Sequence, residues 1–187
     1  GGAIYGSPKK IPADEKTFPS PLSPYALSKL LAEEVVKFYS QQLALNYLIF
    51  RYSNVYGPRQ NPKGEAGVVA IFGLLMKNGK RPVIFGDGSK VRDYLYVGDV
   101  AKANAIGLNR GKNETLNLGS GAPVSDQKIF DTLAAELNFR EKPIYAPYRK
   151  GEVYRITLNA NRAKKILGWQ PKVKLKEGIR TTSSTIR

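Results

Sequence analysis

The chain has 187 residues, about the size of one domain, and its 42% hydrophobic content is typical of a globular protein. It contains no run of about 18 apolar residues, so we expect no membrane-spanning segment. Cysteine and histidine are both absent, which excludes disulfides, thiolate metal sites and the commonest general base. We therefore expect no metal site, and acid–base chemistry must rely on Tyr, Lys, Asp or Glu.

A formal net charge of +15 indicates either an anionic partner or a basic surface. The basic residues are dispersed from Lys9 to Arg187 and form no long block interleaved with aromatic residues, which argues against specific nucleic-acid binding. A phosphorylated small molecule would need only a few of these cations. We interpret most of the charge as a basic surface.

The first residues, Gly1 to Gly6, read as the end of a buried strand that runs into a turn. The only methionine is Met76, so we expect sequence upstream of Gly1 to be missing. A proline-rich loop over 7–22 follows. Further along the chain, the patterns predict helices at about 24–42, 68–77, 99–109, 125–137, 161–167 and from 175, and strands at 46–52, 83–85, 91–97, 115–119 and 143–145.

The helix from Pro24 carries the clearest periodic pattern. Ser23 suits its cap and Pro24 its first position. We expect Glu33 and Lys37 to form an outward-facing pair. Core spacing is expected for five apolar residues: Leu27, Leu30, Leu31, Val35 and Phe38.

Alternation of helices and strands predicts an α/β fold with a parallel sheet. The polar segment Ser53 to Arg59 leaves the carboxyl end of the strand at 46–52. Ligands bind at that edge of an open α/β sheet.

Tyr25 and Lys29 stand one helical turn apart on one face. A phenol titrates near pH ~10, and a neighbouring ammonium that favours the phenolate lowers its pKa toward working pH. Such a tyrosine can take a proton from an alcohol and return it. The alternative for Tyr25 and Lys29 is a surface tyrosine beside a solvated lysine. One other pair has the same spacing, Tyr5 and Lys9. Pro8 lies between its members, so we do not expect them to share a helical face.

Six ordered motifs resemble those of the extended short-chain dehydrogenase/reductase family, within it the UDP-glucose 4-epimerase group. They are the Tyr-Gly turn at 5–6, Ser-Pro-Tyr-x-x-Ser-Lys at 23–29, Arg-Tyr-x-Asn-Val-Tyr-Gly-Pro-Arg at 51–59, Val-Ile-Phe-Gly-Asp-Gly at 83–88, Arg-Asp-Tyr-x-Tyr-Val-x-Asp at 92–99, and Leu-Gly-Trp-x-Pro at 167–171 followed by Gly178-Ile179.

This resemblance implies the C-terminal part of an NAD-binding, Rossmann-like, doubly wound sheet plus a smaller α/β substrate-binding domain. Residues 1–60 would be the C-terminal portion of the Rossmann-like domain, whose N-terminal part is missing. Residues 61–187 would bind the sugar nucleotide, with about 92–119 returning to the Rossmann-like domain.

By the same resemblance, Tyr25 is the catalytic tyrosine. Lys29 lowers the pKa of Tyr25 and bonds the nicotinamide ribose of NAD. Tyr52 and Asn54 would lie between the nicotinamide and the sugar nucleotide, with Asn54 donating to ligand oxygens. The alternative for Asn54 is a turn-capping asparagine.

The nucleotide part of the site is implied in the same way. Ile84 and Phe85 resemble the strand whose backbone reads the uracil edge, although any buried strand would look similar. Arg92 and Arg149 resemble the diphosphate clamp, for which guanidinium geometry is suited, and would otherwise be ordinary surface arginines. Glu152 resembles the acidic residue that holds the uridine ribose hydroxyls, where aspartate is frequent.

Two features of the family pattern are not found in this sequence. The serine or threonine that bonds the substrate hydroxyl belongs four or five residues before Tyr5, at Gly1 or earlier. The chain also contains no Gly-x-x-Gly-x-x-Gly phosphate loop. We expect both upstream, and without them the chain is not expected to hold NAD.

The leading hypothesis is NAD-dependent epimerisation at carbon 4 of a UDP-hexose, UDP-glucose or UDP-galactose, by a cytoplasmic homodimer that associates through the helix from Pro24. The first alternative is an NDP-sugar dehydratase or decarboxylase of the same fold; those relatives commonly carry an acidic residue where this chain has Ala3. The second is a sugar-nucleotide-binding module that does not catalyse.

Overall fold

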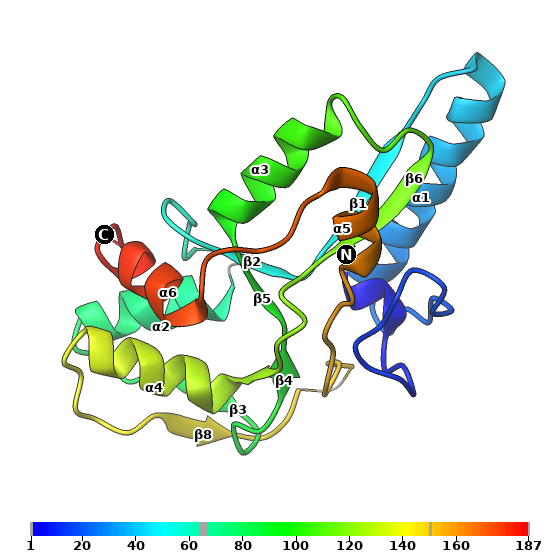
Figure 1. The fold of residues 1–187 in the computed structure, drawn as a ribbon. Coiled ribbons are helices and arrows are strands. Elements are labelled where there is room, and N and C mark those ends of the chain that lie inside the picture. The colour runs from blue at the N-terminus through cyan, green and yellow to red at the C-terminus, as the bar shows by residue number, and fades with distance from the viewer. Residues whose placement is uncertain (1, 64–66, 150, 187) are drawn as a thin grey trace.

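Helices and strands alternate along the chain in a computed structural model that describes residues 2–63, 67–149 and 151–186 (Figure 1). In chain order the elements are the 3-10 helix η1 (Gly2–Tyr5), α1 (Pro24–Leu43), β1 (Leu48–Tyr52), β2 (Asn54–Tyr56), α2 (Val68–Lys77), β3 (Val83–Phe85), β4 (Val91–Arg92), β5 (Tyr94–Tyr96), α3 (Val97–Gly107), β6 (Glu114–Leu118), β7 (Val124–Ser125), α4 (Asp126–Glu136), β8 (Ile144–Ala146), α5 (Asn161–Leu167) and α6 (Leu175–Ser183).

Among the described residues, three of the four strand pairs are parallel. These are β1 with β6, β2 with β5, and β3 with β8, whereas β4 and β7 pair antiparallel. The extended stretch of β1 and β2 changes its partner at Ser53, whose N–H donates to the Leu118 carbonyl, while the next N–H, of Asn54, donates to the Asp93 carbonyl. Asn54 therefore begins a new strand pair at the carboxyl end of β1. The parallel pairs, with helices between their strands, confirm the predicted α/β fold class.

Two large hydrophobic clusters form most of the core. One packs α3 and α5 against β1 and β6; its buried members are Leu95, Val100, Ala103, Leu116, Leu118, Ala163, Leu167 and Trp169. The other lies among α2, α4, α6 and β3 and contains Tyr56, Val69, Phe72, Met76, Ile84, Tyr94, Ile129, Phe130, Leu133 and Ile179. The division into domains at residues 1–60 and 61–187 stays a prediction.

Most helix bounds match the sequence-based expectation because local capping groups set them. The Ser23 side chain accepts from the Ala26 N–H at 3.2 Å at the start of α1, and Ser125 accepts from the Lys128 N–H at 3.1 Å at the start of α4. Gly168 ends α5 in the left-handed conformation. Within the described ranges, each helix is too short or too polar to cross a membrane.

The prediction that five apolar residues of α1 face a core is wrong for four of them, whereas Leu30 packs against the buried cluster that contains Tyr5 and Leu158. Leu27, Leu31, Val35 and Phe38 are 46%, 55%, 54% and 57% exposed. In Figure 1 the helix lies at the edge of the molecule, beside β1 and β6. Its spacing is that of a packed helix, but the surfaces that would cover these residues are not among the described elements.

The expected outward pair of Glu33 and Lys37 is also wrong. Glu33 is buried and accepts two hydrogen bonds from Arg51 of β1, from Nε at 2.9 Å and Nη2 at 2.6 Å. Arg51 Nη1 donates to the Tyr5 hydroxyl, which donates to Asn117 Oδ1, both at 2.8 Å. Lys37 pairs with Glu34 instead. The buried network attaches α1 to the sheet through a charged side chain, which a hydrophobic pattern does not predict.

Two further expectations need correction. The segment 2–5 is a 3-10 helix and not a strand, because Gly6 donates back to the Ala3 carbonyl at 3.2 Å; a short apolar run does not distinguish the two. Asp99 does not cap α3, which begins two residues earlier. Its buried carboxylate accepts instead from the N–H groups of Lys172 and Val173, at 2.8 and 2.9 Å.

Candidate functional site

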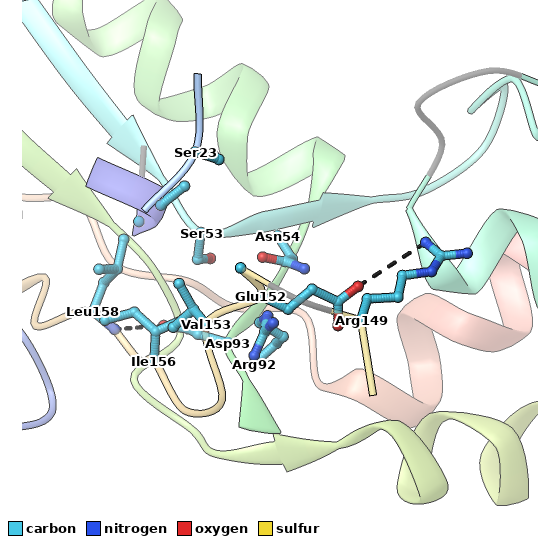
Figure 2. A pocket seen from close by; sticks show the side chains of 13 residues that line it. Ser23, Ser53, Asn54, Arg92, Asp93, Arg149, Glu152, Val153, Ile156 and Leu158 are labelled. Atoms are coloured by element: carbon cyan, nitrogen blue, oxygen red, sulfur yellow. Dashed lines mark hydrogen bonds and ion pairs between the residues drawn. The ribbon is translucent and has the colours of Figure 1, made fainter. Parts of the chain in front are cut away.

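Two cavities share four polar residues and form one groove. The first has a volume of about 430 Å³ and the second about 400 Å³. Asn54, Arg92, Arg149 and Glu152 line both, and they come from β2, β4 and the segment after β8 (Figure 2). The fold therefore brings together four of the residues singled out from the motifs, all of them predicted to bind substrate.

The first cavity lies beside the start of α1. Gly2, Ala3 and Ser23 line one part of it, and Ser53 lies next to Asn54. Val153, Ile156 and Leu158 provide an apolar part of the wall. This end offers a small polar space next to the cap of the helix that carries Tyr25 and Lys29.

The second cavity has an apolar lining on the side of α2 and β3. Its lining residues include Val68, Ile71, Phe72, Leu75, Val83, Ile84, Phe85 and Tyr94. Ile84 and Phe85 are therefore placed in the same groove as the arginines. An apolar pocket with a few polar groups is the usual form of a small-molecule site.

The two arginines supply positive charge where the cavities meet. Arg92 Nη1 donates to the carbonyls of Val91 and Tyr154, at 3.0 and 3.3 Å. The Arg149 guanidinium lies 3.6 Å from the centre of the Phe85 ring, and its Nη1 is 4.0 Å from Glu152 Oε1. Two guanidinium groups at one groove are suited to phosphate oxygens, which they bind in a bidentate manner.

Lys90 and Asp126 also belong to the site, and sequence reasoning missed both. Lys90 forms an ion pair with Glu152, and its Nζ lies 3.5 Å from Asp126 Oδ2. Burial raises the pKa of the Asp126 carboxyl, while Lys90 and Arg92 act to lower it. These contacts join segments far apart in the chain, so a local pattern does not predict them. The one local signal for Lys90 is its position two residues before Arg92.

Tyr25 and Lys29 share one face of α1, as predicted. The Lys29 ammonium lies 5.3 Å from the centre of the Tyr25 ring, and half of the Tyr25 side chain is exposed. Tyr52 lies elsewhere: its hydroxyl donates to Asn104 of α3 at 3.1 Å. The roles of these three residues stay predictions.

The family described as GDP-mannose 4,6 dehydratase matches residues 2–182 of the chain. The chain belongs to this family. The motif-based resemblance to the extended short-chain dehydrogenase/reductases and their UDP-glucose 4-epimerase group is confirmed at the level of family and fold.

Among curated relatives, a protein of Methanocaldococcus jannaschii is 52% identical over 180 residues, which are 96% of this chain and 58% of the relative. The UDP-glucose 4-epimerase of Mycolicibacterium smegmatis is 39% identical over 188 residues, 100% of this chain and 60% of its own length. The chain thus spans less than two thirds of the length of these relatives.

Solved structures show the same fold. The UDP-glucose 4-epimerase of Thermotoga maritima, crystallised with UDP-glucose, superposes with a TM-score of 0.96 at 45% identity, over 99% of this chain and 60% of that one. The UDP-glucose 4-epimerase of Thermus thermophilus in complex with NAD gives 0.91 at 39% identity, over 99% and 61%. These neighbours confirm a Rossmann-type α/β fold.

Proposed function

We propose that the intact protein interconverts UDP-glucose and UDP-galactose by transient, NAD-dependent oxidation at carbon 4. The observation that carries this proposal is the groove in which Asn54, Arg92, Arg149 and Glu152 meet, next to the helix that bears Tyr25 and Lys29. The similarity to UDP-glucose 4-epimerases, one of them holding UDP-glucose and another NAD, supports it.

Each groove residue has a role that its chemistry suits. Arg92 and Arg149 bind the diphosphate, and the Glu152 carboxylate accepts from the ribose hydroxyls. The backbone of Ile84 and Phe85 reads the uracil edge. Asn54 donates to ligand oxygens at the end of the groove where the hexose lies.

The proton transfers fall to Tyr25. Tyr25 takes the proton from the hydroxyl on carbon 4 and later returns it, and the Lys29 ammonium lies one helical turn away, 5.3 Å from the centre of the Tyr25 ring. Bound NAD supplies the hydride acceptor and donor. Tyr25 and Lys29 would contact it, because both are exposed at the start of α1 and offer polar groups to its ribose.

We also propose that α1 forms a homodimer interface. Val36, Tyr39 and Leu43 are 41%, 55% and 59% exposed, in addition to the four exposed apolar residues of α1 given above. A helix that exposes apolar side chains on more than one stripe needs more than one packing partner. Light scattering on the intact protein should give twice the monomer mass, and a monomeric mass would contradict this interface.

A 4,6-dehydratase activity is the second candidate, since the matching family carries that description. Ala3 lines the first cavity and offers no carboxylate for an elimination there. This observation favours epimerisation over dehydration.

A substrate panel separates these activities. The intact protein is incubated with NAD and UDP-galactose, UDP-N-acetylglucosamine or dTDP-glucose, and the products are identified by NMR. Formation of UDP-glucose from UDP-galactose supports the proposal. A 4-keto-6-deoxy sugar from dTDP-glucose without epimerisation of either UDP-sugar would contradict it.

A further inference from the structure

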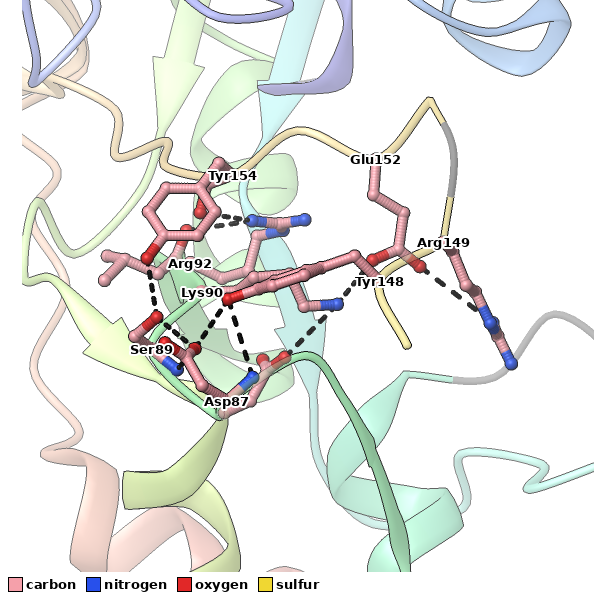
Figure 3. A network of polar contacts seen from close by, with 10 residues as sticks. Asp87, Ser89, Lys90, Arg92, Tyr148, Arg149, Glu152 and Tyr154 are labelled. Carbon is pink, nitrogen blue, oxygen red and sulfur yellow. Dashed lines mark hydrogen bonds and ion pairs between the residues drawn. The ribbon is translucent and has the colours of Figure 1, made fainter. Parts of the chain in front are cut away.

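Lys90 lies behind the wall of the groove and contacts two carboxylates that line it. Its side chain is 8% exposed and is not among the residues found to line either cavity within the described part of the chain. The ammonium forms an ion pair with Glu152 Oε2 and lies 3.5 Å from Asp126 Oδ2 (Figure 3). One buried cation therefore joins two acidic groups of the wall without being placed to touch a ligand itself.

The backbone of Lys90 is held at the start of α4. Its carbonyl accepts from the Asp126 N–H at 3.0 Å, and the Gly88 carbonyl accepts from the Gln127 N–H at 3.0 Å. Two backbone hydrogen bonds thus tie the segment from which the lysine stem starts to the first turn of α4.

The segment that carries Glu152 is attached to the same turn on both sides. The Asp87 carboxylate accepts from the Tyr148 hydroxyl at 2.6 Å and from Ser89, and these hydrogen bonds lower its pKa to about 2. Ser89 Oγ lies 2.6 Å from the Tyr154 hydroxyl (Figure 3). Glu152 thus lies, in the sequence, between two tyrosines whose hydroxyls contact this turn.

We propose that Lys90 is a positioning residue that holds the Glu152 carboxylate toward the ribose hydroxyls of a bound uridine diphosphate. This inference rests on the proposed function. Without a cation between them, the carboxylates of Glu152 and Asp126 would repel each other, and Glu152 would turn away from the groove. A carboxylate held in place accepts from both ribose hydroxyls, so a ligand without the 2′-hydroxyl loses one of these two hydrogen bonds.

The test compares UDP with 2′-deoxyuridine diphosphate by isothermal titration to the intact protein. We expect the parent to prefer UDP by roughly 10- to 100-fold, the value of one hydrogen bond to a charged group. Lys90→Met should reduce this preference to within about twofold, whereas Lys90→Arg should keep most of it. Lys80→Met, at an exposed lysine outside the groove, is the matched control and should behave like the parent.

A parent-like preference for UDP in a folded Lys90→Met variant would overturn the positioning role and leave the proposed function intact. Should Lys90→Met unfold, Lys90→Gln is measured, because it removes the cation but keeps a polar side chain and leaves both carboxylates in place; a parent-like preference for UDP there also overturns the proposal. A parent that binds neither nucleotide would instead contradict the proposed function.

Discussion

Arg92 and Arg149 hold their guanidinium groups in different ways. Arg92 is anchored by two backbone carbonyls, whereas Arg149 is exposed and rests on the Phe85 ring. If both bind the diphosphate, replacing either by alanine removes hydrogen bonds to a charged group. We expect Arg92→Ala and Arg149→Ala each to weaken UDP binding by about 1.5–3 kcal/mol.

Isothermal titration measures these losses, and Arg140→Ala, at an exposed arginine outside the groove, is the control. UDP affinity equal to that of the parent in both groove variants would show that the clamp is misplaced.

Three buried tyrosines set the alkaline limit of stability. Burial raises the pKa of Tyr5, Tyr56 and Tyr94 above the ordinary value of about 10. These phenols ionise near pH ~10 in the unfolded chain but stay neutral to higher pH in the folded one, so their contribution to stability is fully present below pH ~10 and is lost as the pH rises beyond it. Among the described atoms, the Tyr94 hydroxyl is buried without a hydrogen-bond partner.

We therefore expect Tyr94→Phe to leave the free energy of unfolding at pH 7 unchanged or higher by up to about 1 kcal/mol, since no hydrogen bond is lost. Between pH ~10 and ~11 its urea midpoint should fall less steeply than that of the parent, because one of the shifted phenols is gone. A steeper fall, or a clear loss of stability at pH 7, would contradict this account.

At the scale of elements, α1 is attached to the sheet mainly through the buried pair of Glu33 and Arg51. Removing Glu33 leaves a guanidinium buried without its partner, so we expect Glu33→Ala to lower the free energy of unfolding by about 3–5 kcal/mol. The neighbouring Glu34, in an exposed pair with Lys37, is the matched control, and Glu34→Ala should cost less than about 1 kcal/mol. Equal losses in urea unfolding would contradict the assigned role of Glu33.

The same helix shows what the sequence could and could not predict. Its start at Pro24 follows from local chemistry, because Ser23 caps it, and α4 and α5 are predictable for similar reasons. Which side of α1 is buried depends on distant partners, so a periodic pattern placed Leu27 and Leu31 inside and Glu33 outside, the reverse of what is observed.

In the candidate site, too, some residues could be predicted from local motifs and others could not. Motif order identified Asn54, Arg92, Arg149 and Glu152, which do meet at one groove. Lys90 and Asp126 were missed because their contacts depend on the packing of α4 against the turn before β4. Local sequence does not encode that packing.

At the scale of the whole molecule, α1 leaves apolar residues exposed, and in the part of the chain that the structure describes β1 and β6 pair only with each other. Exposed apolar side chains and open strand edges favour aggregation. The sequence contains no Gly-x-x-Gly-x-x-Gly loop to bind the cofactor phosphates, and placement of reactants is worth roughly 7–11 kcal/mol to catalysis. We expect residues 1–187 expressed alone to be poorly soluble and inactive with added NAD and UDP-galactose; measurable epimerisation in that assay would contradict this expectation.

The central claim is that Tyr25 transfers a proton to and from a sugar nucleotide held in this groove. Tyr25→Phe in the intact protein removes only the phenolic oxygen, and general acid–base catalysis contributes about 10²–10⁴-fold. The direct measurement is the rate of UDP-galactose epimerisation by Tyr25→Phe, together with its UDP affinity. We predict a turnover lower by that factor with affinity nearly unchanged, whereas unchanged turnover would contradict the assignment of Tyr25 as the catalytic residue.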